Sequence, residues 1–315
     1  MNPLSALYGA AVRTRNQLYD RGMLTVNRLQ GPVVSIGNLT VGGSGKTPFL
    51  ILLGELLRQR GVGFDVLSRG YRRQTHGTAL VDPAGSPREF GDEPLLIARK
   101  LGVPVVVGED RYRAGQLAEE LFGPQLHLLD DGFQHRQLAR DFDIVLVTPD
   151  DAGDSLLPAG RLREPLASLS RADVIVLTND AACDNLGLTT QLVWRVRRDI
   201  LPPQASGACI AFCGIARPEG FFAQLRASRV NLAATRSFRD HHFYTEADIR
   251  ELIQLRKQHS ANAFVTTEKD AVNLGPQVEQ LQPVHVVPLR MQLEHPEAAL
   301  DALLTTIAQR KHPLA

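Results

Sequence analysis

A glycine-rich turn between a predicted strand and a predicted helix constrains the fold of this chain more than any other feature. Residues 32–37 read PVVSIG, a run typical of a buried strand, and residues 49–61 read FLILLGELLRQRG, typical of a helix. Between them lie Gly42, Gly43, Ser44, Gly45, Lys46, Thr47 and Pro48. Such glycines let backbone N–H groups turn toward phosphate oxygens, and the helix N-terminus adds partial positive charge. The sequence therefore predicts a phosphate-binding P-loop.

Strand and helix signals alternate around this loop. The strand signals lie at residues 63–68, 103–107, 126–129, 142–147 and 173–177, and the clearest helical segments are 94–101 and 111–122. This alternation favours an α/β fold of the P-loop NTPase-like class, with a doubly wound, mostly parallel sheet. Residues 70–90 are richer in polar residues, glycine and proline, so we expect an inserted hairpin or small lobe there.

The length of 315 residues is typical of two domains. We expect residues 31–190 to form the P-loop core, residues 191–205 a linker, and residues 206–315 a smaller α/β domain that closes over the site. In the smaller domain, strands are expected at 208–213, 263–267 and 284–288, and helices at 245–259 and 296–309.

The charge and hydropathy patterns exclude some functions. The formal net charge is only +1, so no broad basic surface for nucleic acid is expected, and we predict no nucleic-acid partner. No run of about 18 apolar residues occurs, so no membrane-spanning helix is expected.

A second predicted strand ends in two carboxylates, Asp130 and Asp131. In P-loop proteins an acidic strand end holds Mg²⁺, directly or through water, together with the loop hydroxyl, here that of Thr47. Lys46 is expected to reach the β- and γ-phosphates of a nucleotide. The alternative is that the two aspartates only cap a loop.

Residues 177–180, which read LTND, bear on which nucleotide base the protein binds. GTPases usually carry an Asn/Thr-Lys-x-Asp motif at about this place. Here the lysine is missing and the aspartate comes one residue early. We interpret the segment as a polar loop, and we expect ATP rather than GTP.

The best candidate for a proton-accepting carboxylate is the segment Gly91-Asp92-Glu93-Pro94. A kinase must position an acceptor hydroxyl and usually uses a carboxylate to accept its proton. The same residues are also typical of a helix start, where Asp92 or Glu93 would cap the first turn. A capping role does not exclude a catalytic one.

In the second domain, adjacent Asp240, His241 and His242 could form a proton relay or polarise a catalytic carboxylate. A metal-binding histidine pair and a plain polar loop before the helix at 245–259 are the alternatives. Residues 266–270, TTEKD, form a further polar cluster at a strand end, with a role in loop geometry or interdomain contact. Arginines also gather in three loops and could neutralise phosphate or remain ordinary surface residues: Arg69, Arg72 and Arg73; Arg111 and Arg113; Arg161 and Arg163.

Residues 1–30 predict an amphipathic, basic helix that is part of the first domain. Leu4, Leu7, Tyr8, Ala11 and Leu18 recur at roughly helical spacing. Such a helix can lie in a membrane interface and favour anionic lipid. The alternative is a helix that packs on its own domain, with its charges solvated.

Taken together, the motifs SIGNLTVGGSGKTP, LSRGYRR, GDEP, GEDRYRAG, LLDDGFQH, LPAGRLREP, the Asp240-His241 segment and VTTEKDAV resemble those of the tetraacyldisaccharide 4′-kinases. The resemblance runs over nearly the whole chain. Thr40, which stands where the general P-loop consensus has glycine, is usual in this family. The resemblance implies Mg²⁺-dependent transfer of the ATP γ-phosphoryl group to the 4′-hydroxyl of a tetraacylated glucosamine disaccharide 1-phosphate. It also implies peripheral association with the cytoplasmic face of a Gram-negative inner membrane, through the helix at 1–30; we expect a monomer.

The resemblance also implies roles for individual residues. Asp92 would be the catalytic base, and His241 would be its partner from the second domain. Glu93, Asp130 and Asp131 would surround Mg²⁺ together with Thr47. Gly42 to Pro48 would hold the nucleotide, and Arg113, Gln134, Arg163 and Glu164 are further candidates for the site.

Two other functions remain open at the level of sequence. A P-loop kinase of a soluble sugar or metabolite would need neither lipid nor the N-terminal helix. A nucleotide-driven switch or metal-delivery GTPase would prefer GTP and turn over slowly without an acceptor, and the missing base-reading motif argues against it.

Overall fold

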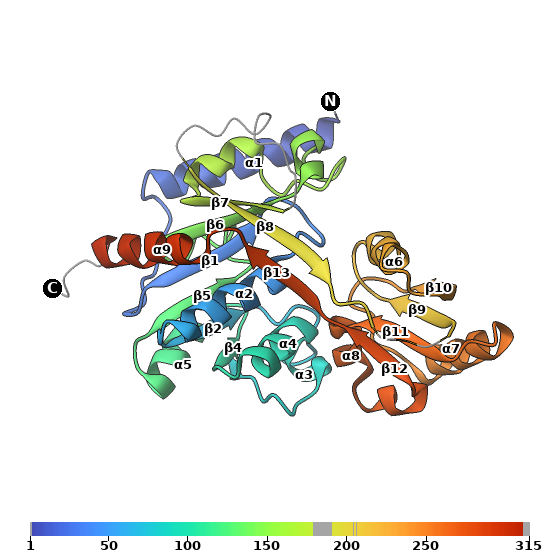
Figure 1. Ribbon diagram of the computed structural model, residues 1–315. Helices are drawn as coiled ribbons and strands as arrows, with labels where there is room; N and C mark the ends of the chain where they lie inside the picture. The colour runs from blue at the N-terminus through green and yellow to red at the C-terminus, as the bar shows by residue number, and fades with distance from the viewer. Residues whose placement is uncertain (1, 179–190, 204, 206, 311–315) are drawn as a thin grey trace.

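Two β-sheets organise the chain in a computed structural model that describes residues 2–178, 191–203, 205 and 207–310 (Figure 1). In order across the nine-stranded sheet, the strands are β13 (Leu289–Leu293), β8 (Leu192–Ile200), β7 (Val174–Thr178), β6 (Phe142–Val147), β1 (Val33–Asn38), β5 (Leu126–Asp130), β2 (Phe64–Ser68), β4 (Val105–Val107) and β3 (Ala79–Leu80). All neighbours are parallel except the two edge pairs, β13 with β8 and β3 with β4. The predicted doubly wound α/β sheet is therefore confirmed.

Helices cover both faces of this large sheet. They are α2 (Lys46–Gln59), α3 (Pro87–Phe90), α4 (Asp92–Leu101), α5 (Arg111–Phe122) and α9 (Pro296–Arg310), with short 3₁₀ turns at Pro149–Gly153 and Leu166–Arg171. β1 is buried along its whole length, as expected for a central parallel strand. Its Val34 and Ile36 pack into a core shared with α2, α4 and α9, whereas Val33 packs with α5 on the opposite face.

The second sheet is smaller and entirely parallel. Its strands are β10 (Leu232–Ser237), β9 (Cys209–Cys213), β11 (Ala263–Thr267) and β12 (Val284–Val287), with α6 (Pro218–Ala227), α7 (Glu246–Gln258), α8 (Glu268–Leu274) and a 3₁₀ turn at Gly275–Leu281 around it. The helix expected at 245–259 is α7. It begins at a capping box in which Thr245 and Asp248 exchange backbone and side-chain hydrogen bonds.

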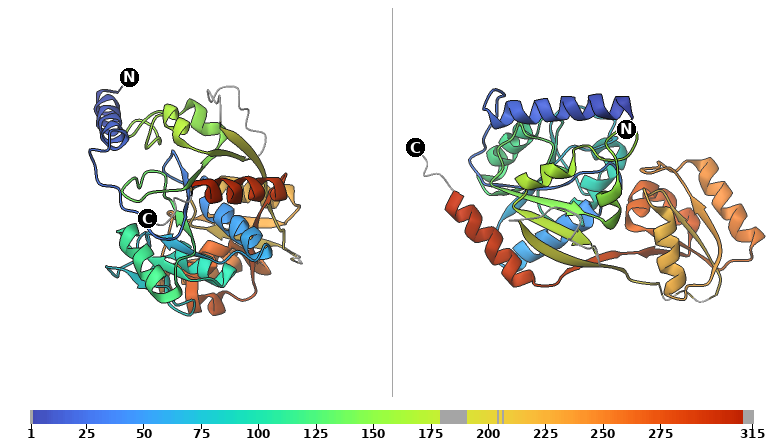
Figure 2. Two further views of the ribbon diagram at one scale, coloured as in Figure 1. Left: turned by 90° about the vertical axis from the view of Figure 1, so that its left-hand side faces the viewer. Right: turned by 90° about the horizontal axis from the view of Figure 1, so that it is seen from above.

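Strand pairing corrects two expected boundaries. Residues 191–205 are not simply a linker, because β8 continues the large sheet beside β7. The second unit does not extend to residue 315 either, because β13 pairs antiparallel with β8 and α9 packs in the core of the large sheet. Figures 1 and 2 show β8 and β13 side by side, with the chain continuing from them into the small unit. The chain therefore enters and leaves the second unit through one two-stranded connection.

Of the hairpin or small lobe expected within residues 70–90, the hairpin is wrong. This segment contributes the short strand β3, which pairs with β4 at the sheet edge, and the short helix α3. The apolar residues that suggested a hairpin form β3, which pairs with β4 rather than with a strand inside the same segment.

The helix expected within residues 1–30 is α1 (Pro3–Asp20), which lies along the outside of the large unit (Figure 2). Its buried residues are small or polar, namely Ser5, Gly9 and Asn16. Leu4 and Leu7 are instead 62% and 69% exposed. The helix thus packs on its own unit, as one interpretation expected, while Leu4 and Leu7 face outward; the membrane interpretation stays a prediction.

We expect Leu303→Ala to lower the free energy of unfolding by about 2–5 kcal/mol, because Leu303 of α9 is fully buried in the core of the large sheet. Trp194, the single tryptophan, lies in β8 within the same core and reports this unit by its fluorescence during urea unfolding. Thr305→Ala, at an exposed position of the same helix, is the control and should shift the midpoint little. An unchanged Trp194 transition in Leu303→Ala would show that α9 does not pack on this sheet.

Candidate active site

A cavity of about 1290 Å³ lies between the two units, at the carboxyl ends of central strands of the large sheet. Its lining includes Val41 to Pro48, Ser68, Arg69, Asp92, Glu93, Asp130, Asp131, Arg163, Asp240, His241, Lys269 and Met291. The carboxyl edge of a parallel sheet is where open α/β folds bind their ligands. Most candidate residues from the sequence therefore meet in one place.

The glycine-rich loop has the backbone shape that a phosphate cradle requires. Gly42 and Gly45 have φ of 103° and 88°, which side-chain-bearing residues rarely adopt. A Cβ on Gly45 would lie 2.6 Å from Met291 Cε, so the loop is also tightly enclosed. Gly45 directly precedes α2, and the hydroxyl of buried Ser44 has no partner among the described residues. The loop thus presents backbone donors, a helix N-terminus and an unpaired hydroxyl to the cavity.

Lys46 joins the loop to the acidic strand end. Its Nζ donates to Asn38 Oδ1 at 2.9 Å and lies 3.3 Å from Asp131 Oδ1. Arg163 Nη1 donates to Asp131 Oδ2 at 2.9 Å. Asp131 therefore carries two cationic partners, which places positive charge at the floor of the cavity.

The two adjacent aspartates have opposite electrostatic environments. Burial and the negative charges of Glu93 and Asp131 raise the pKa of Asp130 to about 7. Burial acts in the same direction on Asp131, but the charges of Lys46 and Arg163 outweigh it and lower its pKa to about 2. Within the described part of the chain, Asp130 forms no ion pair, although the charge of Lys46 partly offsets its raised pKa.

The carboxylates suit a magnesium ion better than a structural metal. Within the described ranges, no group of three His, Cys, Asp or Glu side chains is placed to hold a metal by itself. Mg²⁺ needs fewer protein ligands, because one or two carboxylates, waters and substrate phosphates usually complete its coordination shell. Asp130 Oδ1 is buried without a hydrogen-bond partner, while Ser68 donates to Oδ2 at 2.9 Å. An unpaired carboxylate oxygen beside the P-loop fits the group that the sequence predicts.

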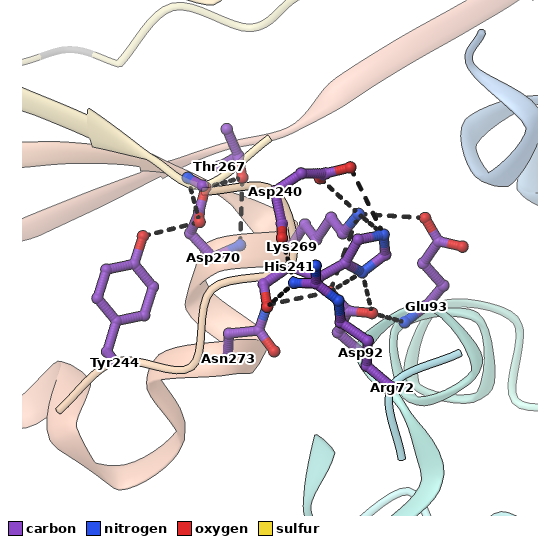
Figure 3. Close-up of polar contacts among 11 residues, drawn as sticks. Arg72, Asp92, Glu93, Asp240, His241, Tyr244, Thr267, Lys269, Asp270 and Asn273 are labelled. Carbon is purple, nitrogen blue, oxygen red and sulfur yellow. Dashed lines mark hydrogen bonds and ion pairs between the residues drawn. The ribbon is translucent and has the colours of Figure 1, made fainter. Parts of the chain in front are cut away.

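Asp92 and His241 come together from the two units (Figure 3). Asp92 opens α4 and is buried, and His241 Nδ1 lies 2.9 Å from both of its carboxylate oxygens. Burial opposes the ionisation of Asp92, but the hydrogen bond from His241 and the charge of Lys269 outweigh it and lower its pKa. His242 instead lies 3.0 Å from Asp248 Oδ2. The geometry therefore distinguishes the two neighbouring histidines.

Asp92 lies at the helix start, but the capping residue is Gly91, not Asp92 or Glu93 as expected, and no side chain of the described residues caps this helix. Gly91, with φ of 90°, precedes α4, and Glu93 N donates to Asp92 Oδ1 at 2.9 Å. The carboxylate therefore serves the first helical turn and the cavity at once.

His241 is held in an unusual backbone conformation. Its φ is 57°, in the left-handed region that costs energy for a residue with a side chain. Its N–H donates to Gly214 O at 3.1 Å, and Arg72 of the large unit donates to its carbonyl oxygen. Bonds from both units thus stabilise the backbone that brings the imidazole to Asp92.

Two residues of α8 belong to the same cluster, and the sequence did not assign either of them to the site. Lys269 Nζ lies 3.2 Å from Glu93 Oε1 and 3.1 Å from His241 Nε2. Asn273 Nδ2 donates to Asp92 Oδ2 at 3.0 Å. The VTTEKDAV motif contains Lys269 and was the available signal, whereas nothing in the sequence distinguishes Asn273.

Some expected residues do not reach the cavity. Arg113 has a 77% exposed side chain and is not among the described residues that line it. Gln134 Nε2 donates to Asn38 O at 2.9 Å, so it supports the floor rather than lining it. Glu164 is buried away from the cavity and accepts from Asn16 and Arg171. The base-reading interpretation of residues 177–180 concerns Asn179 and Asp180, which lie outside the described residues.

Asp130→Asn should stabilise the protein at high pH when metal and nucleotide are withheld. A carboxyl whose pKa is near 4 unfolded and about 7 folded loses folding stability as pH rises between those values, because the folded state resists ionisation. The expected gain is about 1–4 kcal/mol near pH 8, at about 1.4 kcal/mol per pKa unit, and clearly less at pH 5. Urea unfolding at both pH values measures it.

Asp131→Asn is the matched control, with the opposite sign. Its low folded pKa means that ionisation stabilises the fold above pH 4, and that this contribution is lost only as pH falls through 2. Asp131→Asn should therefore lose stability near pH 7. Equal effects of the two substitutions would contradict the assigned environments.

Comparison with known proteins agrees with this site. The family model described as tetraacyldisaccharide-1-P 4′-kinase (LpxK) matches residues 1–309. A tetraacyldisaccharide 4′-kinase of Koribacter versatilis is 53% identical over 321 residues, covering 99% of this chain and 100% of that protein. One from Geobacter metallireducens is 39% identical and covers 96% of each chain. A crystal structure of LpxK from Aquifex aeolicus in complex with ATP superposes with a TM-score of 0.80, at 36% identity and 97% coverage of both chains.

The match extends over both sheets, so it includes the P-loop and the second unit that supplies His241. The fold and the P-loop agree with these matches, which cover nearly the whole chain and carry the same name. The chain belongs to the tetraacyldisaccharide 4′-kinase family, the ATP-dependent kinases of lipid A biosynthesis.

Proposed function

We propose that this chain uses ATP and Mg²⁺ to phosphorylate the 4′-hydroxyl of a tetraacylated glucosamine disaccharide 1-phosphate, with Asp92 as the catalytic base. The observation that carries the proposal is the Asp92–His241 pair, which shares one cavity with the P-loop. The Aquifex relative was crystallised with ATP, which supports ATP as the nucleotide here. A proton acceptor beside a phosphate cradle is what phosphoryl transfer to an alcohol requires.

The proton and the phosphoryl group have separate carriers. The sugar hydroxyl oxygen attacks the γ-phosphorus, its proton passes to the Asp92 carboxylate, and ADP leaves with the electron pair of the broken P–O bond. Lys46 and Arg163 supply the positive charge near the cradle. Bound Mg²⁺ would neutralise phosphate charge, with Asp130, Glu93 and the Thr47 hydroxyl as its candidate ligands.

The second unit completes the site because His241 and Lys269 come from it. Contact between the units also shields the cavity from bulk water, and this favours transfer to the sugar over hydrolysis. Lys100 of α4 pairs with Glu268 of α8 and adds a second ionic contact across the same boundary.

Labelled ATP in mixed micelles tests the proposal. We expect Mg²⁺-dependent labelling of the tetraacyl disaccharide 1-phosphate with ATP, and none with GTP. Labelling of a deacylated disaccharide at an equal rate would favour a soluble-sugar kinase. GTP hydrolysis without any labelled lipid would favour a nucleotide switch and overturn the proposal.

In this assay Asp92→Asn should lower kcat by about 10²–10⁴-fold and change the KM for ATP only a few-fold, because the amide cannot accept the hydroxyl proton. Asp248→Asn is the matched control, since it alters the neighbouring Asp–His pair outside the cavity. It should retain wild-type turnover. Unchanged kcat in Asp92→Asn would remove Asp92 from the role of base.

We further propose that α1 attaches the enzyme to the cytoplasmic face of the inner membrane. Leu4 and Leu7 project outward, and Met23 and Val26 beyond the helix are 66% and 46% exposed. Exposed arginines accompany them on the same segment and would favour anionic headgroups. Within the described part of the chain, no helix is both long and apolar enough to cross a bilayer. These features support interfacial binding.

Leu4→Ser combined with Leu7→Ser should weaken binding to anionic vesicles by at least about tenfold, because a leucine that moves fully from water into the bilayer contributes roughly 1.5–3 kcal/mol. Vesicle co-sedimentation measures the loss, and the lipid kinase rate on vesicles should fall with it. Leu121→Ser with Phe122→Ser removes similarly exposed apolar groups from α5 and serves as the control. Equal losses in both double variants would contradict the assignment to α1.

A further inference from the structure

Lys269 contacts the second ring nitrogen of His241, and its Nζ also lies 3.9 Å from Asp92 Oδ2 (Figure 3). His241 Nδ1 lies 2.9 Å from both Asp92 oxygens, and its Nε2 lies 3.1 Å from Lys269 Nζ. Both ring nitrogens are therefore engaged, one by a carboxylate and the other by an amine. Since the side chain of His241 is only 11% exposed, water has little access to replace either contact.

Counting donors and acceptors defines where the imidazole proton lies. Asp92 accepts from Glu93 N and Asn273 Nδ2 as well as from His241, so its carboxylate acts as an acceptor throughout. His241 Nδ1 must then carry a hydrogen. A lysine ammonium has three donors and no acceptor, so Nε2 must present its lone pair to Lys269.

The other protonation states of His241 meet a donor where they need an acceptor. An Nε2–H group, in the alternative tautomer or in the imidazolium, would face the ammonium at 3.1 Å. The nearest carboxylate oxygen to Nε2, Asp240 Oδ2, lies 3.7 Å away, beyond hydrogen-bond distance. Lys269 itself is fixed by Glu93 at 3.2 Å and by Asp240 at 3.4 Å. The ammonium therefore cannot leave Nε2 without losing two ionic partners.

We propose that Lys269 is a positioning residue that holds His241 as the neutral Nδ1–H tautomer. In this state His241 orients Asp92 through a hydrogen bond but cannot take the substrate proton at Nε2, which is covered. Asp92 is then the proton acceptor of the pair. The kinetic consequence rests on the proposed kinase function, whereas the tautomer assignment does not.

Nitrogen-15 NMR of the full-length protein, labelled at its histidine rings, tests the tautomer directly. His241→Gln identifies the signals of His241. In the wild type we expect Nδ1 to resonate as a protonated ring nitrogen and Nε2 as an unprotonated one near pH 7. A protonated Nε2 in the wild type would overturn the proposal, whether or not the enzyme is active.

Two substitutions at Lys269 distinguish the effect of its N–H donor from the effect of its side-chain volume. Lys269→Met removes the ammonium, which leaves Nε2 near Asp240 and free to take a proton, so its signal should shift to the protonated type. Lys269→Arg keeps an N–H donor and should keep the wild-type signals. Lys100→Met removes another Lys–Glu contact between α4 and α8 and should leave both His241 nitrogens unchanged. An unprotonated Nε2 in Lys269→Met would overturn the proposal.

Kinetics add a readout that a purely structural role would not move. Lys269→Met should lower kcat about ten- to hundredfold, because an imidazolium beside Asp92 weakens it as a base, while the KM for ATP stays within a few-fold. Lys269→Arg should recover most of kcat. Loss of kcat in both variants with wild-type His241 signals would overturn the positioning role. Wild-type enzyme that shows the expected tautomer but phosphorylates no lipid would instead refute the proposed function alone.

Discussion

The Asp92 carboxylate is the point at which the two units of this protein depend on each other. A buried anion is costly unless hydrogen bonds and opposite charge compensate it. Among the described partners of Asp92, Glu93 N comes from the large unit, whereas His241, Asn273 and Lys269 come from the small one. Ionised Asp92 therefore stabilises the arrangement in which the second unit lies against α4. The same contact that helps hold the units together also forms the proposed proton-accepting pair.

Positive and negative side chains are unevenly distributed around the cavity. Asp131 is neutralised by Lys46 and Arg163, whereas Asp130 faces Glu93 and Asp131 with an oxygen left unpaired. On the wall formed by α8, Lys269 lies near the carboxylates of Asp92, Glu93 and Asp240. Their negative charges raise the pKa of Lys269 despite its burial. Among the described residues, Asp130 has an unpaired oxygen and no ion pair, and this supports its proposed role as a ligand of Mg²⁺.

The sequence predicted the centre of the site well because its parts are local. A strand, a glycine-rich turn and a helix are contiguous, and so are the strand and carboxylates at Asp130. It failed where the outcome depends on pairing between distant segments: β13 returns to β8, and β3 pairs with β4. Asn273 went unnoticed because nothing on its own helix shows that Asp92 lies opposite. Arg113 was expected in the site but does not line the cavity, because a motif shows which residues are close along the chain and not where a side chain points.

The N-terminal helix is joined to the site more closely than its place at the surface suggests. Tyr8 Oη donates to Arg163 O at 2.9 Å, and Arg15 Nη2 donates to Gln134 O at 2.6 Å. The side chain of Arg163 holds Asp131, and that of Gln134 bonds to β1 beside the P-loop. If α1 binds the bilayer through Leu4 and Leu7 as proposed, it cannot tilt without moving the loops at the cavity floor that it contacts. Membrane binding by α1 would thus fix the height of the cavity above the lipid surface, so that a headgroup hydroxyl can reach Asp92 while its acyl chains stay in the bilayer.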